Sequence, residues 1–521
     1  MNKRTVRLRN YLAYGANDYL GAGAMAVIST WILFFYTTYC GLSPGEAALI
    51  FAIARVIDAV ASPLIGHLSD NFYGNRLGRR FGRRRFFLLI SIPLSFSFAL
   101  MWVSGQHFLY YLATYVFFEV VYALELIPYE TLAAEMSDDY RTRAKFAGSR
   151  ILFGQSSAIL ATFLPALLET FGQKDSVDTF FWLGLSFALS FMVVITLVWT
   201  FTWERSPQEV DALHDPTQRP SALESLRRLY RDLWSTLRIR AFRLHLGMYL
   251  GGYISQDIFN AVFTYFVVFA VGGLALGSKV AGTSGLLTLM YVAQFVSVMT
   301  FIPLCLRWAP APSYRLAVSF YAVALLALLA LYLAAPANPA PWIIGIVMLA
   351  GLGRGGLNYI PWSVYNYMAD VDEIVTGRRR EGTFAGVMTF VRKTAQALAV
   401  LAVGHILQAS GFVSGSATQS APVLHTIVAI MIGGTLFVLG AGVLVSLRFR
   451  LDRHTHEVLM EEIARFKRAD TAPPPAERRA IIEDLTGWPY ERLWGHNPVG
   501  RHDGAERAAR DASATDVVAR R

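Results

Sequence analysis

The chain has 521 residues, of which 54% are hydrophobic and only 16% are charged. Soluble domains carry about 25% charged residues, so this composition excludes an ordinary soluble protein and indicates an all-α polytopic protein embedded in a lipid bilayer. The formal net charge of +10 would suggest a nucleic-acid partner in a soluble protein. Here the basic residues lie in loops between apolar segments, where Lys and Arg set the topology, so we expect no nucleic-acid partner.

Twelve apolar segments are long enough to cross about 30 Å of hydrocarbon as helices. Basic connections alternate along the chain with connections of little charge, which places both termini in the cytoplasm and the protein in the plasma (inner) membrane. The first segment lacks a small-residue cleavage site, so we expect a retained helix. We predict spans at residues 11–40, 44–69, 85–105, 108–136, 145–172, 178–203, 242–273, 279–306, 313–334, 341–370, 381–411 and 422–447.

A long basic stretch after the sixth span divides the spans into six and six. This division is typical of the major facilitator fold, in which the substrate site lies between two halves near the membrane midplane. Residues 453–468, beyond the last span, have the pattern of a short amphipathic helix, and we expect a monomer. We predict an N-terminal half, a cytoplasmic central loop, a C-terminal half and a cytoplasmic tail at residues 1–203, 204–241, 242–447 and 448–521.

Charged residues in the second span are the first functional candidates, because an ionised side chain at the centre of a membrane helix costs about 3 kcal/mol. The spacing of Arg55, Asp58 and Ser62 places them on one helix face. We predict that Asp58 binds a coupling cation, with Arg55 as its partner. The alternative is a structural ion pair that locks the helix.

The fourth and fifth spans add acids and a base. Glu119, Glu125 and Glu130 share the fourth span with a proline, whose ring removes a backbone hydrogen bond and leaves polar groups suited to a cavity wall. We expect Glu119 to bind substrate, Glu125 to take part in coupling and Glu130 to be a gate or loop partner. Arg150 opens the fifth span, where it either contacts substrate or anchors the helix at the membrane surface.

Polar residues on other spans complete the candidate substrate site. Trp362 follows a glycine-rich run and either stacks on a sugar ring or packs in the core. Lys393 lies deep in the eleventh span and should pair with Asp58 or with an acid of the fourth span, since a lysine at that depth needs a carboxylate. The other candidates for substrate contact are Tyr14, Asp18, Asp257, Arg354, Asn358 and Arg392.

The cations inside the spans about match the acids in number. Any of them without an internal partner could receive a carboxylate-bearing substrate, because the planar guanidinium of arginine matches a carboxylate. These cations are Arg55, Arg150, Arg354, Arg392 and Lys393. Gating contacts that exchange during transport are expected near the cytoplasmic ends of the spans, at Asp70, Arg79, Arg80, Glu130, Asp372, Arg378 and Arg379.

Enzyme and metal-site motifs are missing from the sequence. Neither His-Glu-x-x-His nor Gly-x-Ser-x-Gly occurs, so we do not expect an enzyme. Cys40 and Cys305 both lie in apolar segments and form neither a metal-ligand spacing nor a disulfide framework. No cofactor is expected other than a coupling ion, H⁺ or Na⁺.

Several of these motifs together resemble the glycoside–pentoside–hexuronide:cation symporter family, the family of the melibiose permease and a part of the major facilitator superfamily. The resemblance covers most of residues 10–447. The basic loop 77–85 is also similar to the oligogalacturonide transporter branch. The matching segments are Tyr14–Asp18, Arg55–Pro63, Ile127–Leu132 with Arg150, Asp370–Gly382, and Phe390–Lys393 with Gln396.

The resemblance implies a cation site at Asp58 and roles in sugar binding and coupling for Arg150 and Lys393. This chain departs from the family pattern at three acids. The second acid of the cation motif is Ser62, the sugar-binding acid of the first helix falls on Ala22, and the acid before the Ile-Pro pair falls on Leu126, next to Glu125. These departures favour a proton over sodium, because a single carboxylate carries a proton without a cage of oxygen ligands.

We therefore expect a secondary transporter that imports sugar derivatives, uronides or oligouronides, by cation symport as its two halves rock around the central site. A symporter of lysolipids or other amphiphiles is the alternative within the family. A transporter-like sensor or a membrane enzyme is the alternative from a different class.

Overall fold

The computed structural model describes residues 5–70, 72–137, 139–206, 227, 230–231, 234–272, 278–377, 380–468 and 474–497. These residues form helices and connections, with no strand among them. Eleven helices in this part of the chain are long and apolar enough to cross a membrane. A shorter apolar helix, Arg85–Leu100, occupies the predicted third span. The all-α, polytopic class is confirmed.

The first six spans form one bundle of helices. The first span is interrupted at Asn17, between its first two helices, and the third is broken near Pro93, whose ring removes a backbone donor. In chain order the elements are α1 (Leu8–Ala16), α2 (Asp18–Val27), η1 (Ile28–Ile32), α3 (Leu33–Thr38), α4 (Pro44–Asp70), η2 (Phe72–Gly74), α5 (Arg76–Phe81), α6 (Arg85–Leu94), α7 (Ser97–Leu100), α8 (Phe108–Met136), α9 (Tyr140–Phe171) and α10 (Asp178–Phe201).

The last six spans form a second bundle, which is followed by the tail helices. The elements are α13 (Arg240–Tyr265), η4 (Phe266–Ala270), α14 (Lys279–Trp308), α15 (Pro310–Ala334), α16 (Ala340–Thr376), α17 (Glu381–Ala409), α18 (Ala421–Val428), η6 (Ala429–Gly434), α19 (Thr435–Ser446), α20 (Arg453–Lys467), α21 (Ala476–Thr486) and η7 (Tyr490–Arg492). α20 confirms the predicted amphipathic helix in the tail.

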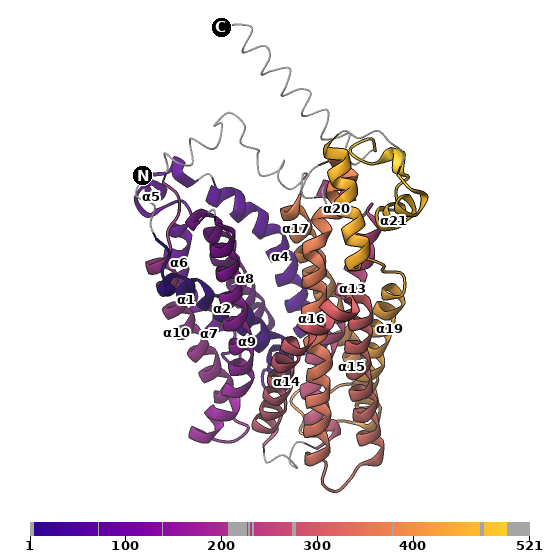
Figure 1. Ribbon diagram of the computed structural model, residues 1–521. Helices are drawn as coiled ribbons and strands as arrows, with labels where there is room; N and C mark the ends of the chain where they lie inside the picture. Colours follow the sequence, from indigo (N-terminus) through magenta and orange to yellow (C-terminus); the bar gives the residue numbers. More distant parts are fainter. Residues whose placement is uncertain are drawn as a thin grey trace.

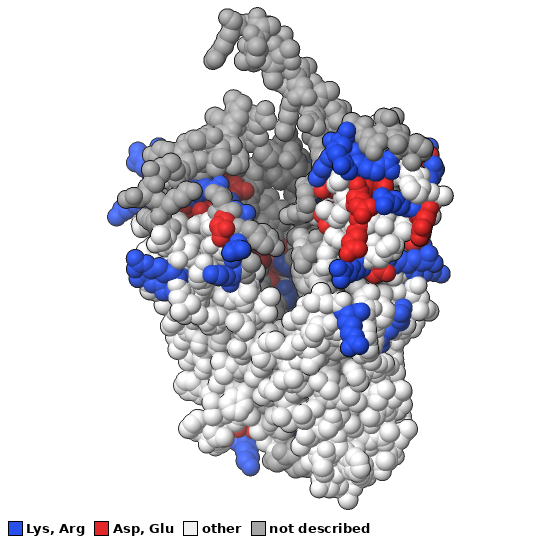
Figure 2. Space-filling view, viewed as in Figure 1, with Lys and Arg blue, Asp and Glu red and all other residues white. Residues whose placement is uncertain are grey.

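The two bundles lie side by side (Figure 1). They meet mainly along two helix pairs, α4 with α17 and α9 with α14, and α13 also contacts η1 and α3. We call the end of the molecule that carries residues 72–85 and the tail helices the basic end, and the opposite end the far end. Charged side chains gather at the basic end, above a broad uncharged belt (Figure 2). Such a belt is the surface expected to face lipid.

The halves are packed tightly at the far end. A Cβ on Gly404 of α17 would lie only 2.3 Å from the Cβ of Ala48 and 2.5 Å from the carbonyl oxygen of Pro44, both on α4. Glycine permits this close approach because it has no side chain. The hydroxyls of Thr37 and Tyr265 add a hydrogen bond of 2.7 Å between the halves.

Two carboxylates of the N-terminal half bind the start of α14 at the same end. Glu169 accepts hydrogen bonds from the Ser278 hydroxyl at 2.5 Å and from the Ala281 backbone nitrogen at 3.2 Å. Asp175 accepts from the Val280 backbone nitrogen at 3.1 Å. The first backbone N–H groups of a helix lack intrahelical partners and attract negative charge, so these contacts hold α14 to the opposite half.

The halves separate toward the basic end. Figure 2 shows a hollow between them there, with charged atoms of both signs visible inside it. The helix pair α4 and α17 descends from the hollow to the tight contact at Gly404. The molecule is therefore open at the basic end and closed at the far end.

The tail is folded against the second bundle. α16 continues to Thr376, beyond the predicted residue 370, and ends at Gly377, whose φ of 74° is a left-handed conformation that glycine adopts easily. Lys467 of α20 pairs with Glu373 of this extension at 2.7 Å. The backbone nitrogen of Trp494 donates to the carbonyl oxygen of Ile374 at 2.8 Å, which satisfies one of the last carbonyls of α16.

Candidate substrate and coupling site

A buried ion pair joins the two halves at mid-depth. Lys393 Nζ of α17 lies 2.5 Å from Asp58 Oδ2 of α4, and the Asp58 side chain is fully buried. The Ser62 hydroxyl donates to the other carboxylate oxygen, Oδ1, at 3.0 Å. Lys393 therefore has the partner expected on the second span and not one of the fourth-span acids. Among pairs of described residues, this is the only ion pair that connects the halves.

Arg55 does not pair with Asp58, contrary to the sequence-based expectation. Its guanidinium lies 3.4 Å from Glu119 Oε1 of α8 and stacks over the Phe51 ring at 5.1 Å. Residues three apart share a helix face, but the long Arg55 side chain points toward α8 and not along its own helix. Glu119 is fully buried by this contact, so it does not line the hollow as a substrate ligand.

A second cluster on the N-terminal half contains the predicted substrate residue Arg150. Its guanidinium lies 3.0 Å from Asp18 Oδ1 of α2 and 3.6 Å from Glu130 Oε1 of α8. All three side chains are partly exposed, as expected for residues that line a polar cavity. Glu130 thus lies beside the binding residues as well as being a candidate gate.

Tyr14 lies behind this cluster and does not face the hollow. Its ring is buried and stacks on Tyr129 with 4.6 Å between centroids. The Tyr129 hydroxyl donates to the Tyr14 carbonyl at 2.7 Å, and Arg150 stacks over the Tyr129 ring at 5.2 Å. Tyr14 supports the arginine through Tyr129, which corrects its assignment as a direct substrate contact.

The C-terminal half carries a matching arginine–carboxylate pair. Arg392 of α17 holds Asp257 of α13 with two contacts, of 2.6 and 2.8 Å. Gln396 Nε2 donates to the same carboxylate at 3.1 Å. Arg392 also stacks over the Tyr253 ring at 5.0 Å. A two-contact pair of this kind fixes the orientation of both side chains.

Trp362 and Asn358 of α16 extend this surface. The Trp362 indole nitrogen donates to the Tyr253 hydroxyl at 2.9 Å, and 42% of the residue is exposed. An exposed ring held by a hydrogen bond fits a stacking surface better than a packed core residue. Asn358 accepts a hydrogen bond from Gln256 of α13 at 3.1 Å.

Of the five candidate cations inside the spans, Arg354 is the one whose contacts among the described residues are all with uncharged groups. It is almost completely buried, and it donates to Asn260 Oδ1 at 3.0 Å and to Gln294 Oε1 at 3.3 Å. Its guanidinium also lies 5.6 Å from the ring centroids of Phe259 and Tyr291. In this conformation it is enclosed by its own half and has no direct access to the hollow.

Glu125 is also buried, but unlike Arg354 it has no hydrogen-bond partner. It is 1% exposed, and neither of its carboxyl oxygens has a hydrogen-bond partner. It faces Asn17, at the break between α1 and α2, whose side-chain nitrogen and oxygen are also buried without partners. No ion pair to Glu125 forms among the described residues.

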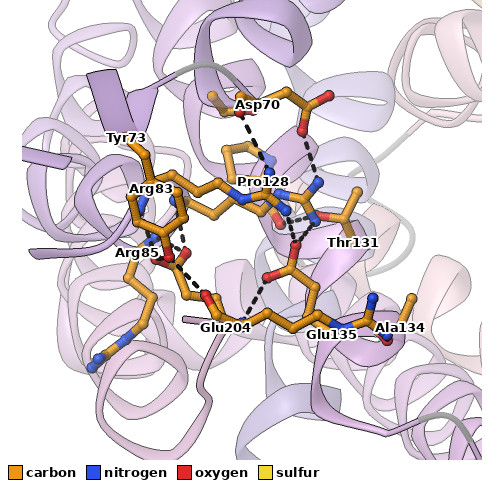
Figure 3. A network of polar contacts seen from close by, with 12 residues as sticks. Asp70, Tyr73, Arg83, Arg85, Pro128, Thr131, Ala134, Glu135 and Glu204 are labelled. Carbon is orange, nitrogen blue, oxygen red and sulfur yellow. Dashed lines mark hydrogen bonds and ion pairs between the residues drawn. The ribbon is translucent and has the colours of Figure 1, made fainter. Parts of the chain in front are cut away.

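Charged residues at the basic end form a network within the N-terminal half (Figure 3). Arg83 and Arg84 each contact Glu135 of α8 at 2.6 Å, and Arg84 also pairs with Asp70 at 2.7 Å. Glu204 accepts hydrogen bonds from the backbone nitrogens of Arg83 and Arg84.

These contacts involve only one of the first three predicted gate residues, Asp70. Arg79 and Arg80 are exposed, and it is Arg83 and Arg84 that bind Asp70 and Glu135. Arg80 stacks only over the neighbouring Phe81 ring. Tyr73 donates to Glu204 at 2.8 Å, and burial together with that carboxylate raises the pKa of Tyr73.

The second predicted gate residue, Asp372, is held by Arg380. The pair has two contacts, of 2.6 and 2.9 Å, and both residues belong to the C-terminal half. Arg378 and Arg379, which were predicted as gate residues, lie outside the described residues. His456 Nε2 of the tail lies 3.0 Å from Oδ2 of Asp370, which is two residues before Asp372 on α16.

Comparisons with known proteins agree with this architecture. Residues 13–453 match the family model described as MFS/sugar transport protein. The chain belongs to this family.

Individual relatives of this MFS sugar transport protein are distant. An uncharacterized symporter of Synechocystis sp., sll1374, is 25% identical over 79% of this chain and 87% of its own length. A glucuronide carrier protein homolog of Escherichia coli is 24% identical over 87% of this chain and 95% of its own. The crystal structure of the nucleoside transporter NupG covers 85% of this chain and all of its own, with 12% identity and a TM-score of 0.60, which supports the fold alone.

Sequence reasoning did not single out some residues that organise this family member. Glu204 could have been found as the acid that directly follows the sixth span, on the same side of the membrane as the loop with six arginines at residues 75–85. Gln294 could have been found as an amide in the middle of an apolar span. Glu135 carried no such signal, because other acids, Glu130, Asp138 and Asp139, lie close to it in the sequence.

Proposed function

We propose that this MFS sugar transport protein is a secondary active transporter that moves sugar derivatives together with a cation, by alternating access. The observation that carries the proposal is the Asp58–Lys393 pair. It lies at mid-depth, where helices of the two halves meet between the open basic end and the closed far end. A cation that binds Asp58 displaces Lys393, so loading of the ion and contact between the halves are linked.

The proposed coupling ion is a proton. The Lys393 ammonium already contacts one oxygen of the Asp58 carboxylate. Where the family's cation motif has a second acid, this chain has Ser62, whose hydroxyl contacts the other oxygen. A proton needs only one carboxylate oxygen, whereas a bare metal cation prefers several oxygen ligands. We place the basic end in the cytoplasm, following the positive-inside rule, so that the state described is open inward.

The proposed substrate is a uronide or an oligouronide. Arg150 is partly exposed and holds Glu130 only at 3.6 Å, so a substrate carboxylate can replace Glu130 as its second partner. Trp362 offers an exposed ring for a sugar face on the opposite half. The glucuronide carrier homolog among the relatives supports this class.

Uptake into proteoliposomes tests the proposal. We expect glucuronides to accumulate under an inward proton gradient and to compete better than neutral glycosides. Asp58→Asn should abolish accumulation while exchange of substrate continues, because the site is kept but its link to the ion is lost. A proton and a uronide carboxylate together carry no net charge, so the driving force is the pH difference, and each pH unit supplies about 1.4 kcal/mol, or about tenfold accumulation. Unchanged accumulation in Asp58→Asn would remove Asp58 from the mechanism.

One observation favours an amphiphile as a second candidate substrate. A groove of about 740 Å³ opens between α13, α17 and the α18–η6 segment, and its lining is apolar, including Ile258, Ala399 and Ile406. Ile406 is half exposed at the rim. An acyl chain fits such a groove. Lysolipid that inhibits glucuronide uptake, with inhibition relieved by Ala399→Trp, would support this candidate, and absence of inhibition would exclude it.

A further inference from the structure

Charged residues inside the spans of the described chain are almost completely paired. Four cations have carboxylate partners: Arg55 with Glu119, Arg150 with Asp18, Arg392 with Asp257, and Lys393 with Asp58. Two groups remain. Arg354 is held by amides and aromatic rings, which suit a permanent cation. Glu125 has no such environment.

The surroundings of Glu125 stabilise a neutral acid. The carboxyl group is buried and no oxygen of it accepts a hydrogen bond. A buried carboxylate without a partner is strongly disfavoured, whereas the protonated acid needs far less solvation. The Asn17 amide offers an N–H₂ donor and an oxygen acceptor, both unpartnered, so a protonated carboxyl can donate its O–H to the amide oxygen while its carbonyl oxygen accepts from the amide nitrogen. Glu125 is therefore suited to hold a proton.

Glu125 lies close to residues of the predicted substrate site. Asn17, at the break that Glu125 faces, directly precedes Asp18, Glu130 follows Glu125 on the same helix, and both acids contact Arg150. The phenol of Tyr122 lies three residues before Glu125 on α8. A positive charge on Arg150 favours an ionised carboxyl nearby, and negative charges on Asp18 and Glu130 oppose it. At present Asp18 occupies Arg150 at 3.0 Å. An added negative charge on Arg150 would disfavour ionisation of Glu125 further.

We propose that Glu125 binds a transported proton at a site separate from Asp58, and that an anionic substrate on Arg150 and the proton on Glu125 stabilise each other. This inference rests on the proposed function for its substrate. When the substrate leaves, Arg150 is less neutralised and the Glu125 O–H bond breaks. The electron pair stays on the carboxylate, and the proton passes to water in the hollow. By reciprocity, protonation of Glu125 raises the affinity for the substrate by the same factor.

The first test needs no substrate. Infrared titration of the full-length protein should show the C=O stretch of a protonated carboxylic acid at neutral pH, and Glu125→Gln should remove it. Glu125→Asp should shift the band without removing it. Glu46→Gln is the matched control, because Glu46 is an exposed acid at the start of α4 and outside this cluster, and the band should stay. An identical band in the wild type and in Glu125→Gln would overturn the proposal.

The second test uses glucuronide. In the wild type its affinity should fall as pH rises, whereas Glu125→Gln, which resembles the protonated acid, should keep the low-pH affinity at every pH. Accumulation should fall about 50-fold for each coupled charge lost at about 100 mV, with exchange retained. A pH dependence unchanged by Glu125→Gln would overturn the linkage. If the wild type takes up no glucuronide, the proposed substrate fails, while the infrared result still decides whether Glu125 holds a proton.

Discussion

The two ends of the molecule use different contacts. At the far end the halves touch directly, through the glycine contact at Gly404, the Thr37–Tyr265 hydrogen bond and the carboxylates that bind the start of α14. At the basic end the described ion pairs stay inside one half or join the tail to its own half. Arg83 and Arg84 bind acids of the N-terminal half, and Arg380 binds Asp372 of the C-terminal half.

This difference indicates how the halves can part without an electrostatic penalty. The described charges at the basic end are paired within their own half, so they keep their partners when the two halves part. Close packing, a pair of hydroxyls and two carboxylates at the start of α14 seal the far end. Separation there costs packing and hydrogen bonds but breaks no ion pair between described residues. The Asp58–Lys393 pair between the ends is the exception, because parting it leaves two buried charges.

Lys393→Ala should have the largest effect on this arrangement. It leaves the Asp58 carboxylate buried without its partner, and breaking a buried pair in this way typically costs about 3–5 kcal/mol. We expect a lower thermal unfolding midpoint in detergent and loss of gradient-driven uptake. The double variant Asp58→Asn with Lys393→Ala should recover much of the stability, since no charge is left alone. A double variant as unstable as Lys393→Ala would contradict the pairing.

Glu135→Gln should have an intermediate effect, confined to one half. It weakens contacts to Arg83 and Arg84, and hydrogen bonds to charged groups contribute about 1.5–3 kcal/mol each. Hydrogen exchange should increase in residues 72–85 but not in α16 or α17. Arg79→Ala is the matched control, because Arg79 is exposed and such changes stay within about 0.5 kcal/mol. Equal effects of the two variants would refute the network in Figure 3.

Gly404→Ala should have the smallest effect and act on the far end. The added methyl group meets Ala48 and the Pro44 carbonyl, and overpacking of this kind costs about 1–2 kcal/mol. This should raise the population open at the far end about tenfold. Labelling of Thr37→Cys by an impermeant maleimide, with Cys40 and Cys305 replaced by Ser, measures that population. Gly440→Ala is the control, since nothing lies within 4 Å of a Cβ there. Equal labelling in both variants would argue against the far-end contact.

Much of the fold could be predicted from the sequence, because apolar segments lie in the hydrocarbon and charged loops lie outside it. All twelve spans have helices near their expected positions, and α20 was predicted as a separate helix. Errors occurred at helix ends. α16 continues to Thr376 because the tail, which was not expected to pack there, satisfies its last carbonyls.

The candidate site was predicted only in part. The sequence identified Asp58, Arg150, Asp257 and Lys393 as buried or half-buried polar residues, since an ionisable group in an apolar span is visible without a structure. It did not identify most partners. Arg55 was expected to pair along its own helix, and Arg79 and Arg80 were chosen over Arg83 and Arg84 because all of them look alike in a basic loop.

The sequence by itself therefore determined the class of the protein, its spans and the set of charged residues inside them, because burying a charge in hydrocarbon is costly wherever it occurs. Only the tertiary structure decided which charges meet. Pairing depends on how far each helix is rotated and where it crosses its neighbours, and those angles are set by side-chain packing over the whole bundle. For that reason Lys393 pairs with Asp58, Arg55 pairs with Glu119, and the carboxyl oxygens of Glu125 have no hydrogen-bond partner.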